Sequence, residues 1–242
     1  KTAKDGRPYV DLEAATYIVG IIGLNECLQY MIGKELHEED DALKLGLRII
    51  SHMYFKVKEE GKKHNLKFSL EESPAESASR RLAKIDVRNY KEAVDLVKGH
   101  MERDEFYYTN SVHLRPDAPV DMVKRIEVQS MFHSMIESGA IIHAFVGEER
   151  PPASSIMKLV KRTFENTQAA QLTISPEFTI CNECHRVIPR LVDTCTYCDA
   201  SNLYSIKKSA SQSRINNWDR TKMQELVDRH KENSKVSNKS CK

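Results

Sequence analysis

The stretch Cys181-Asn182-Glu183-Cys184, followed after ten residues by Cys195-Thr196-Tyr197-Cys198, is the most informative part of this chain. In each Cys-x-x-Cys pair the backbone can bend so that both sulfur atoms point to one side, and two facing pairs complete a tetrahedron. Four thiolate ligands leave no position for water, which predicts a closed, structural Zn²⁺ site rather than a catalytic one. The spacing therefore indicates a small zinc ribbon, which we expect at residues 178–204.

Disulfides, a redox pair and an iron–sulfur cluster are the alternative uses of these four cysteines. Two disulfides would need an oxidising compartment, and the sequence gives no signal peptide. The other cysteines, Cys27 and Cys241, lie far from any shared pattern. A redox Cys-x-x-Cys is normally a single pair at the start of a helix. Four thiolates also suit an iron–sulfur cluster, so that alternative stays open beside the favoured zinc.

Composition limits the class of protein. The chain has 242 residues, of which 40% are hydrophobic and 30% charged, with a net charge of +2. This is enough apolar material for one large domain, or for a domain with a small appendage. The balanced charge gives no argument for a nucleic-acid or membrane surface, and no apolar run approaches transmembrane length. We expect a cytoplasmic protein with no membrane or specific nucleic-acid partner.

Hydrophobic periodicity predicts alternating strands and helices, which is typical of the α/β class. Residues 11–32 read as a strand or helix, a glycine-containing turn and a helix. Further helices are expected at 39–63, 91–97, 119–138 and 154–166, a helix or turn at 80–86, and strands at 66–70, 105–111, 140–146 and 169–174, with a loop at 71–79. Beyond the ribbon, residues 205–230 hold an aperiodic Lys/Ser-rich stretch and a helix from 219 to 230, and the polar tail 231–242 is expected to be disordered.

Several runs then follow one another in a specific order. They are GIIGLNECLQYMIGKELHE (20–38), ESPAESASRRLAKID (72–86), YYTNSVHL (107–114), FHSMIESGAIIHAFVGE (132–148), ENTQAAQLTISPEFTIC (165–181), the paired Cys-x-x-Cys, and NNWDRTKMQELVDR (216–229). Together they resemble the C-terminal region of the class III anaerobic ribonucleoside-triphosphate reductases, a family of glycyl radical enzymes. The resemblance covers nearly the whole chain. It implies that residues 1–177 form the second half of the reductase α/β barrel and that the zinc ribbon follows it.

The run Ser73-Pro74-Ala75-Glu76-Ser77-Ala78-Ser79 is similar to the family loop that holds substrate phosphates. Small residues let backbone N–H groups approach an anion, hydroxyls donate to its oxygens, and a following helix start adds positive potential. The resemblance implies that substrate is bound by Ser73, Ala75, Glu76, Ser77 and Ser79, with Arg80 and Arg81 able to strengthen the site. An ordinary N-capping loop is the alternative.

Two further runs resemble active-site loops of the family. The run from Gly23 to Glu26 resembles a barrel-lining loop, so that Asn25 and Glu26 become candidate substrate contacts. The run 107–111 resembles a barrel strand that enters an active-site loop, where α/β barrels place their chemistry. It adds Asn110 and Ser111, with Tyr108, as candidates. Tight turns at both places are the alternative.

Four other residues receive structural assignments. We interpret Cys27 as a packed helix residue, because a lone cysteine in an apolar helix is more often core than reactive. The three histidines His113, His133 and His143 are spread over a predicted loop, helix and strand. We interpret them as structural, with contact to phosphate as the alternative.

The radical site is where this sequence departs from the family. The family stores its radical on a glycine in an Arg-x-x-Gly-Tyr motif between the ribbon and the Trp-containing run. Here Ala210 takes the position of the glycine, Lys207 that of the arginine and Ser211 that of the tyrosine, and no glycine follows Gly147. The cysteine that becomes the thiyl radical in the family is expected upstream of Lys1.

The functional expectation is therefore an anaerobic ribonucleoside-triphosphate reductase, present as a fragment or a radical-deficient form. The resemblance implies a ribonucleoside triphosphate substrate, a homodimer, a radical-SAM activating enzyme and either formate or a dithiol as reductant. The alternative is a non-catalytic homologue that binds nucleotide or pairs with an active subunit. A zinc-ribbon nucleic-acid binder is disfavoured by the net charge of +2.

Overall fold

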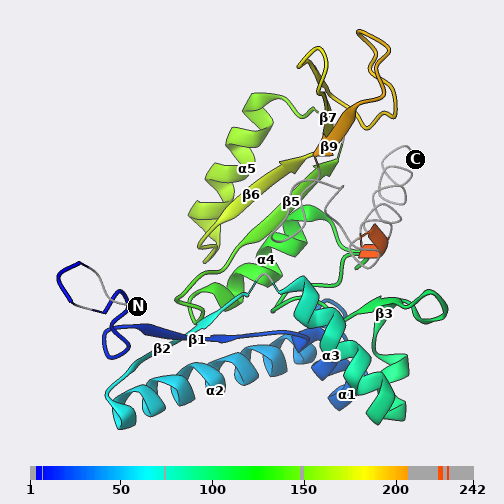
Figure 1. The fold of residues 1–242 in the computed structure, drawn as a ribbon. Coiled ribbons are helices and arrows are strands. Elements are labelled where there is room, and N and C mark those ends of the chain that lie inside the picture. Colours follow the sequence, from blue (N-terminus) through cyan, green and yellow to red (C-terminus); the bar gives the residue numbers. More distant parts are fainter. Residues whose placement is uncertain are drawn as a thin grey trace.

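The computed structural model describes residues 4–6, 8–73, 75–147, 150–206, 223–225 and 228, and it has the expected α/β character (Figure 1). The helices are α1 (Leu24–Ile32), α2 (Asp40–His64), α3 (Glu76–Asn89), α4 (Met122–His133) and α5 (Ala153–Asn166), with short 3₁₀ helices η1 (Lys91–Asp95) and η2 (Met101–Arg103). The strands are β1 (Thr16–Gly20), β2 (Lys67–Glu71), β3 (Lys98–His100), β4 (Glu105–Tyr107), β5 (Ile142–Gly147), β6 (Leu172–Pro176), β7 (Phe178–Cys181), β8 (Val187–Ile188) and β9 (Leu203–Ile206).

Two parallel strand pairs form the framework. β1 pairs with β2, and β5 pairs with β6. Parallel neighbours need a crossover connection. This connection is supplied by α1 and α2 for the first pair and by α5 for the second. Figure 1 shows α2 running along the β1–β2 pair and α5 beside the β5–β6 pair. The carboxyl ends of β1 and β2 therefore lie at the same edge.

The residues that precede β5 join the two pairs at that edge. The backbone N–H of Ser138 donates to the carbonyl of Leu70 at 3.0 Å, and the N–H of Glu72 donates to the carbonyl of Gly139 at 2.9 Å. Through these bonds the segment that leads into β5 lies alongside the end of β2.

The main hydrophobic core lies between α1, α2, β2 and α4. Leu28, Leu70 and Phe132 are completely buried in it. Gly46 of α2 faces the same core, where a Cβ would lie only 2.9 Å from Leu36 Cδ2 and 3.3 Å from Leu28 Cδ1. The glycine therefore allows α1 and α2 to pack closely.

Several predicted elements were confirmed, whereas some boundaries were wrong. The expected helices at 39–63 and 154–166 correspond to α2 and α5, whose apolar residues repeat at helical spacing. The predicted loop at 71–79 is too long, because α3 already begins at Glu76. The N–H of Ser79 donates to the carbonyl of Ala75 at 2.8 Å, so the serine-rich run forms the first turn of a helix instead of a loop.

Three other elements are shorter than predicted. Of the helix expected at 119–138, only the part that forms α4 is helical. The start of α4 is set by Asp121, whose carboxylate accepts a 2.7 Å hydrogen bond from the N–H of Lys124. The strand expected at 105–111 ends at Tyr107, and the chain turns at Ser111, which has a left-handed φ of 51°. The helix expected at 91–97 is the 3₁₀ helix η1.

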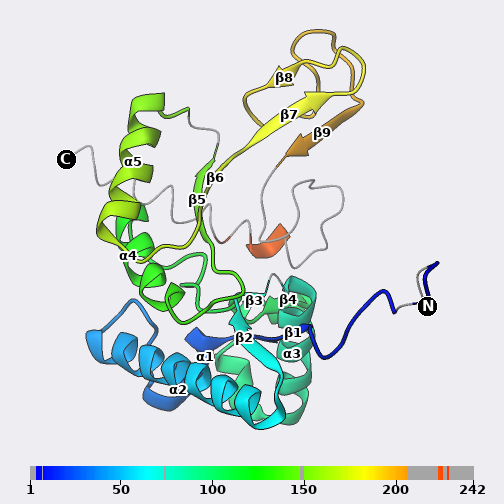
Figure 2. The same ribbon diagram turned by 90° about the vertical axis from the view of Figure 1, so that its left-hand side faces the viewer.

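The ribbon strands form a separate antiparallel sheet in the order β8-β7-β9. In both views the sheet lies at the opposite end of the molecule from α2 (Figures 1 and 2). It has its own small cluster of buried residues, namely Cys181, Ile188 and Cys195. The domain boundary at 177/178 stays a prediction.

The C-terminal residues that the structure describes contact β4. Asp228 accepts a 2.9 Å hydrogen bond from the hydroxyl of Tyr107 and a 2.8 Å bond from Nε2 of Gln224. Ala210, most of the helix expected at 219–230 and the tail 231–242 lie outside the described residues. Among the described residues, no helix combines the length and apolar character needed to cross a lipid bilayer.

Candidate functional site

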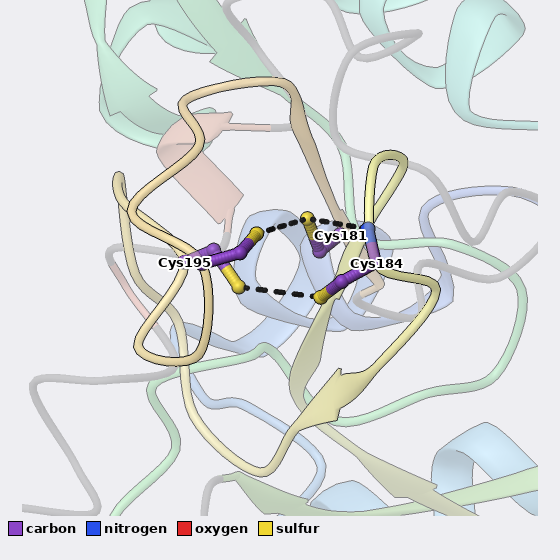
Figure 3. A group of neighbouring side chains, drawn as sticks. Cys181, Cys184 and Cys195 are labelled. Carbon is purple, nitrogen blue, oxygen red and sulfur yellow. Dashed lines mark hydrogen bonds between the residues drawn. The ribbon is translucent and has the colours of Figure 1, made fainter.

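The four cysteines of the ribbon come together as predicted. Their sulfur atoms all lie within 4.8 Å of one another. The sulfur of Cys181 lies 3.6 Å from that of Cys198, and the sulfur of Cys184 lies 3.7 Å from that of Cys195. Figure 3 shows the side chains of Cys181, Cys184 and Cys195 directed toward one another. Zn–S bonds of about 2.3 Å give a tetrahedron with edges of about 3.8 Å, whereas a disulfide measures about 2.05 Å. The spacing therefore suits a tetrahedrally bound metal ion, and the cluster could hold one.

The two Cys-x-x-Cys turns repeat one backbone geometry. In the first turn, the N–H of Cys181 donates to the carbonyl of Arg186 at 3.1 Å, and the carbonyl of Cys181 accepts from His185 at 3.0 Å. The second turn repeats both bonds around Cys195, at 2.8 and 3.0 Å. The residue after each pair is left-handed, with φ 57° at His185 and 56° at Asp199. This repetition makes the pairs two matching knuckles.

In the second knuckle, hydrogen bonds favour the thiolate form of Cys195 alone: the backbone N–H of Ala200 lowers the pKa of Cys198, but hydrogen bonds with the neighbouring thiols and burial raise it to about 12. Burial by itself would raise the pKa of Cys195, but N–H groups of Tyr197 and Cys198 outweigh it and lower the pKa to about 7. The N–H of Tyr197 lies 3.4 Å from the Cys195 sulfur. The Arg186 guanidinium lies 4.9 Å from the centre of the Tyr197 ring, which links the two knuckles. Thiolates are the form in which cysteines bind metals.

The segment after β2 leads directly into the first turn of α3. The N-cap residue, Ala75, makes no side-chain cap, and the first N–H groups of a helix have no intrahelical partner. Ser77 is exposed at the second position of the helix, whereas Ser79 is buried. Ser73 approaches the end of β1 so closely that a Cβ on Gly20 would lie 2.3 Å from its hydroxyl oxygen. The ends of β1 and β2 therefore converge beside the start of α3.

Arg80 is engaged elsewhere. Its Nη2 donates to the carbonyl and the carboxylate of Asp104 at 3.3 and 3.5 Å, and Lys84 also pairs with that carboxylate. Asp104 belongs to the turn between η2 and β4. This placement does not support the expected contribution of the Arg80 guanidinium to a phosphate site.

The two runs predicted to resemble active-site loops meet in the structure. Ile22 and Asn110 form an antiparallel bridge, and the N–H of Gly23 donates to the carbonyl of Thr109 at 2.9 Å. The Thr109 hydroxyl donates to Oε1 of Glu26. Burial raises the pKa of the Glu26 carboxyl, although the bond from Thr109 acts in the opposite direction. Sequence reasoning did not single out Thr109, which lies within the polar run 107–111.

The candidate residues beside them are buried and only partly hydrogen-bonded. The side-chain oxygen of Asn25 accepts a 3.1 Å bond from the N–H of Leu36, whereas its Nδ2 has no hydrogen-bond partner among the described residues. Asn110 and Ser111 are also buried, but Oδ1 of the first and Oγ of the second have no hydrogen-bond partner among the described residues. These two atoms remain available to a bound group.

A pocket of about 410 Å³ lies between α1, α3 and η1. Glu26 and Cys27 of α1 line it together with Tyr108, whose hydroxyl donates to Asp86 at 3.0 Å. Burial raises the pKa of the Tyr108 phenol, and the Asp86 carboxylate raises it further. Cys27 is exposed, and its thiol lies 3.8 Å from the sulfur of Met31. The expectation of a packed cysteine was wrong, because this face of α1 is open.

The histidines that are spread along the sequence gather around Glu72. Nε2 of His113 lies 3.3 Å from Oε2 of Glu72, and Nε2 of His133 lies 3.8 Å from Oε1. The ring of His143 lies edge-on to His113, with 6.1 Å between the ring centres. Sequence reasoning missed Glu72, since nothing in the pattern marks one carboxylate directly before the 73–79 run.

The comparisons with known proteins agree on one family. The family model described as "Anaerobic ribonucleoside-triphosphate reductase" matches residues 5–231. The chain is 24% identical over 141 residues to the anaerobic ribonucleoside-triphosphate reductase of Haemophilus influenzae, and 26% identical over 138 residues to that of bacteriophage T4. These matches cover 58% and 57% of this chain but only 18% and 19% of the relatives, so the chain matches about a fifth of their length.

Solved structures show the same fold. An anaerobic ribonucleotide reductase superposes with a TM-score of 0.69 at 15% identity, covering 90% of this chain and 32% of that one. The anaerobic ribonucleotide reductase from Thermotoga maritima in complex with dATP and CTP gives a TM-score of 0.66 at 15% identity, over 88% of this chain and 33% of that one. The predicted fold, part of a reductase barrel followed by a ribbon, is thereby confirmed.

Proposed function

Since this chain belongs to the anaerobic ribonucleoside-triphosphate reductase family, we propose that it forms the C-terminal part of a ribonucleotide reductase and supplies the loop that binds the substrate's phosphates. The reaction would convert a ribonucleoside triphosphate to its deoxy form, with loss of the 2′-hydroxyl as water and two electrons from formate or a dithiol. The chain matches a minor part of its relatives, so the remaining parts of such an enzyme lie in the other regions of those proteins.

The start of α3 is the observation that carries this proposal. Its first N–H groups have no intrahelical partner and no side-chain cap from the N-cap residue Ala75, and an anion is the natural ligand of such donors. The exposed hydroxyl of Ser77 lies in the same turn. Ser73 and Ala75 precede the turn, and Glu76 and Ser79 belong to the helix itself. Phosphate oxygens would accept from the backbone donors and the Ser77 hydroxyl, whereas the Ser73 hydroxyl donates to Oε2 of Glu71 at 2.9 Å.

The neighbouring loops would contact the rest of the substrate. Asn110 and Ser111 present buried polar atoms that have no hydrogen-bond partner among the described residues, and a buried polar group without a partner costs stability unless a ligand or water satisfies it. Glu26 has a similar buried atom, Oε2. Asn25 holds the turn after α1 through its side-chain oxygen, and its Nδ2 is a further buried atom without a partner among the described residues.

Zinc is the metal we propose for Cys181, Cys184, Cys195 and Cys198. The sulfur spacing and the paired knuckles support a closed tetrahedral site. When bound, the metal would hold the ribbon together without taking part in chemistry. An iron–sulfur cluster is the competing occupant, which metal analysis distinguishes.

The residues present do not fit a glycyl radical. Ala210 stands where the family has its glycine, and the neighbouring arginine and tyrosine are replaced by Lys207 and Ser211. This departure favours a second candidate function, a radical-deficient homologue that binds nucleotide or pairs with an active subunit. A homodimer, a radical-SAM activating enzyme and a cytoplasmic location are further proposals that rest on the family alone.

Calorimetric titration with CTP and ATP tests the phosphate loop. Ser77→Asp places a negative charge at the second position of α3, which should repel phosphate and weaken binding at least tenfold. Ser154→Asp is the matched control, because Ser154 is also an exposed serine at the second position of a helix, α5. Equal affinities for the two variants would remove the phosphate-loop proposal.

A further inference from the structure

Glu72 lies between the proposed phosphate loop and the start of β5. Only 1% of its side chain is exposed, although it is a carboxylate. Its Oε2 accepts a 2.8 Å hydrogen bond from the backbone N–H of Ile141 and faces Nε2 of His113 at 3.3 Å. Its own N–H donates to the carbonyl of Gly139. Glu72 therefore joins the segment after β2 to the segment that enters β5 through hydrogen bonds of both its backbone and its side chain.

The hydrogen-bond pattern decides which histidine nitrogen carries a proton. Nε2 of His113 faces two acceptors, Glu72 Oε2 and the carbonyl of Ile141 at 3.2 Å, so this nitrogen must carry hydrogen. In His133, Nδ1 accepts a 2.9 Å bond from the N–H of Ala170, so Nδ1 is bare and Nε2 carries the hydrogen of the neutral ring. Both histidines thus present N–H groups toward the same carboxylate.

This pattern argues against a metal at Glu72. A metal ligand needs a bare nitrogen, whereas both nitrogens that face the carboxylate are protonated. In the part of the chain that the structure describes, the cysteine cluster is the only group of three or more such ligand atoms close enough to share an ion. The buried carboxylate is therefore balanced by hydrogen-bond donors.

We propose that Glu72 is a positioning residue for the 73–79 segment, and that its pairing with His113 makes nucleotide binding there depend on pH. This proposal rests on the phosphate-binding function proposed above. Glu72 directly precedes Ser73, so the anchor that fixes Glu72 also limits where the next residues lie. Loss of the anchor would leave the donors of α3 in place but let the preceding residues move.

The charges around the pair set the direction of the pH effect. The Glu72 carboxylate raises the pKa of His113 against the effect of burial, and Arg125 of α4 opposes it. Burial raises the pKa of Glu72, but His113 and the N–H of Ile141 outweigh it and leave the pKa lowered. His133 stays neutral because burial lowers its pKa, and His143 packs against the His113 ring. The charged pair therefore exists near pH 6 and is lost as the pH rises through the raised pKa of His113.

Nucleotide titrations over pH 5.5–8.5 test the proposal in the full chain. Glu72→Gln should weaken CTP binding about tenfold at pH 6, the effect of losing one hydrogen bond to a charged group. His113→Gln keeps an N–H donor but cannot titrate. The CTP affinity of this variant should therefore change with pH only because the nucleotide phosphate itself titrates near pH 6. The wild type should show an additional loss of affinity at higher pH.

Hydrogen exchange of the amides in residues 72–79, without nucleotide, gives a second readout. Exchange there should be faster in Glu72→Gln than in the wild type, while the amides of α5 stay unchanged. If CTP does not bind the wild type, the phosphate-binding function fails, and exchange still decides whether Glu72 positions the segment. Unchanged exchange and affinity in Glu72→Gln, or the same pH dependence in His113→Gln and the wild type, would overturn the inference.

Discussion

The Thr109 hydroxyl donates a 2.6 Å hydrogen bond to Oε1 of Glu26, although the two residues lie 83 positions apart. The bond joins the first turn of α1 to the segment that follows β4. Glu26 is 3% exposed, and its other oxygen, Oε2, has no partner among the described residues. The Thr109 hydroxyl thus holds a carboxyl group in a site where burial favours its neutral form.

Glu26→Gln should stabilise the protein at neutral pH. The folded-state pKa of Glu26 is raised above 4.5, so the unfolded chain ionises first and stability falls as the pH rises from 4.5 through the folded pKa. Glutamine does not ionise and keeps an oxygen for Thr109. In urea unfolding between pH 4 and pH 8, the stability difference between the variant and the wild type should grow as the pH rises from 4.5 to the folded-state pKa. Above that pKa the difference should stay constant.

The matched control for this experiment is Glu59→Gln on the exposed side of α2. Its carboxylate is 66% exposed and pairs with Lys56. We expect this variant to stay within about 0.5 kcal/mol of the wild type at every pH. A pH-independent difference for Glu26→Gln would contradict the raised pKa of the buried Glu26 carboxyl.

Metal removal should unfold the ribbon first, because its core consists of few apolar residues beside the cysteines. Cys198→Ser removes one proposed ligand, and Cys27→Ser, outside the cluster, is the control. Metal analysis should find one zinc per chain in the wild type and in the control, and a large loss in Cys198→Ser. Faster hydrogen exchange should be confined to residues 178–206. Full zinc retention in Cys198→Ser would refute the four-cysteine site.

Glu35 is a buried carboxylate that holds two cations. Lys98 Nζ lies 3.0 Å from Oε1, and Arg115 Nε lies 2.9 Å from Oε2. Glu35→Ala leaves both cations without this partner and should lower the free energy of unfolding by about 3 kcal/mol. Glu137→Ala, which removes an exposed pair with Lys58, should cost less than about 1 kcal/mol. Denaturant unfolding measures the loss of stability in each variant. Similar losses in Glu35→Ala and Glu137→Ala would show that burial does not decide how much these ion pairs stabilise the protein.

Gly20→Ala should disturb Ser73, because the added Cβ would lie 2.3 Å from the Ser73 hydroxyl oxygen and 3.0 Å from its Cβ. We expect a lower melting temperature and weaker CTP binding. Removing the opposing side chain with Ser73→Gly in the same protein should recover most of the melting temperature, because the two changes act on one contact. No recovery in the double variant would mean that Gly20 matters for another reason.

The sequence alone determined the features that depend on neighbours in the chain. The two Cys-x-x-Cys pairs predicted matching knuckles because each knuckle needs only the few residues around its own cysteines. The long helix α2 was predicted because apolar residues at helical spacing mark one face over many turns. The order of short runs likewise indicated the family, which the comparison over residues 5–231 confirmed.

Only the tertiary structure decided the contacts between distant residues. It placed Glu72 between His113 and His133, bound Arg80 to Asp104, and buried Glu26 against Thr109. It also began α3 at Glu76, inside a serine-rich run whose local preference is a loop. Each of these depends on which strand ends and helices meet at one edge of the molecule. No local pattern encodes that meeting, because it results from the packing of the whole chain.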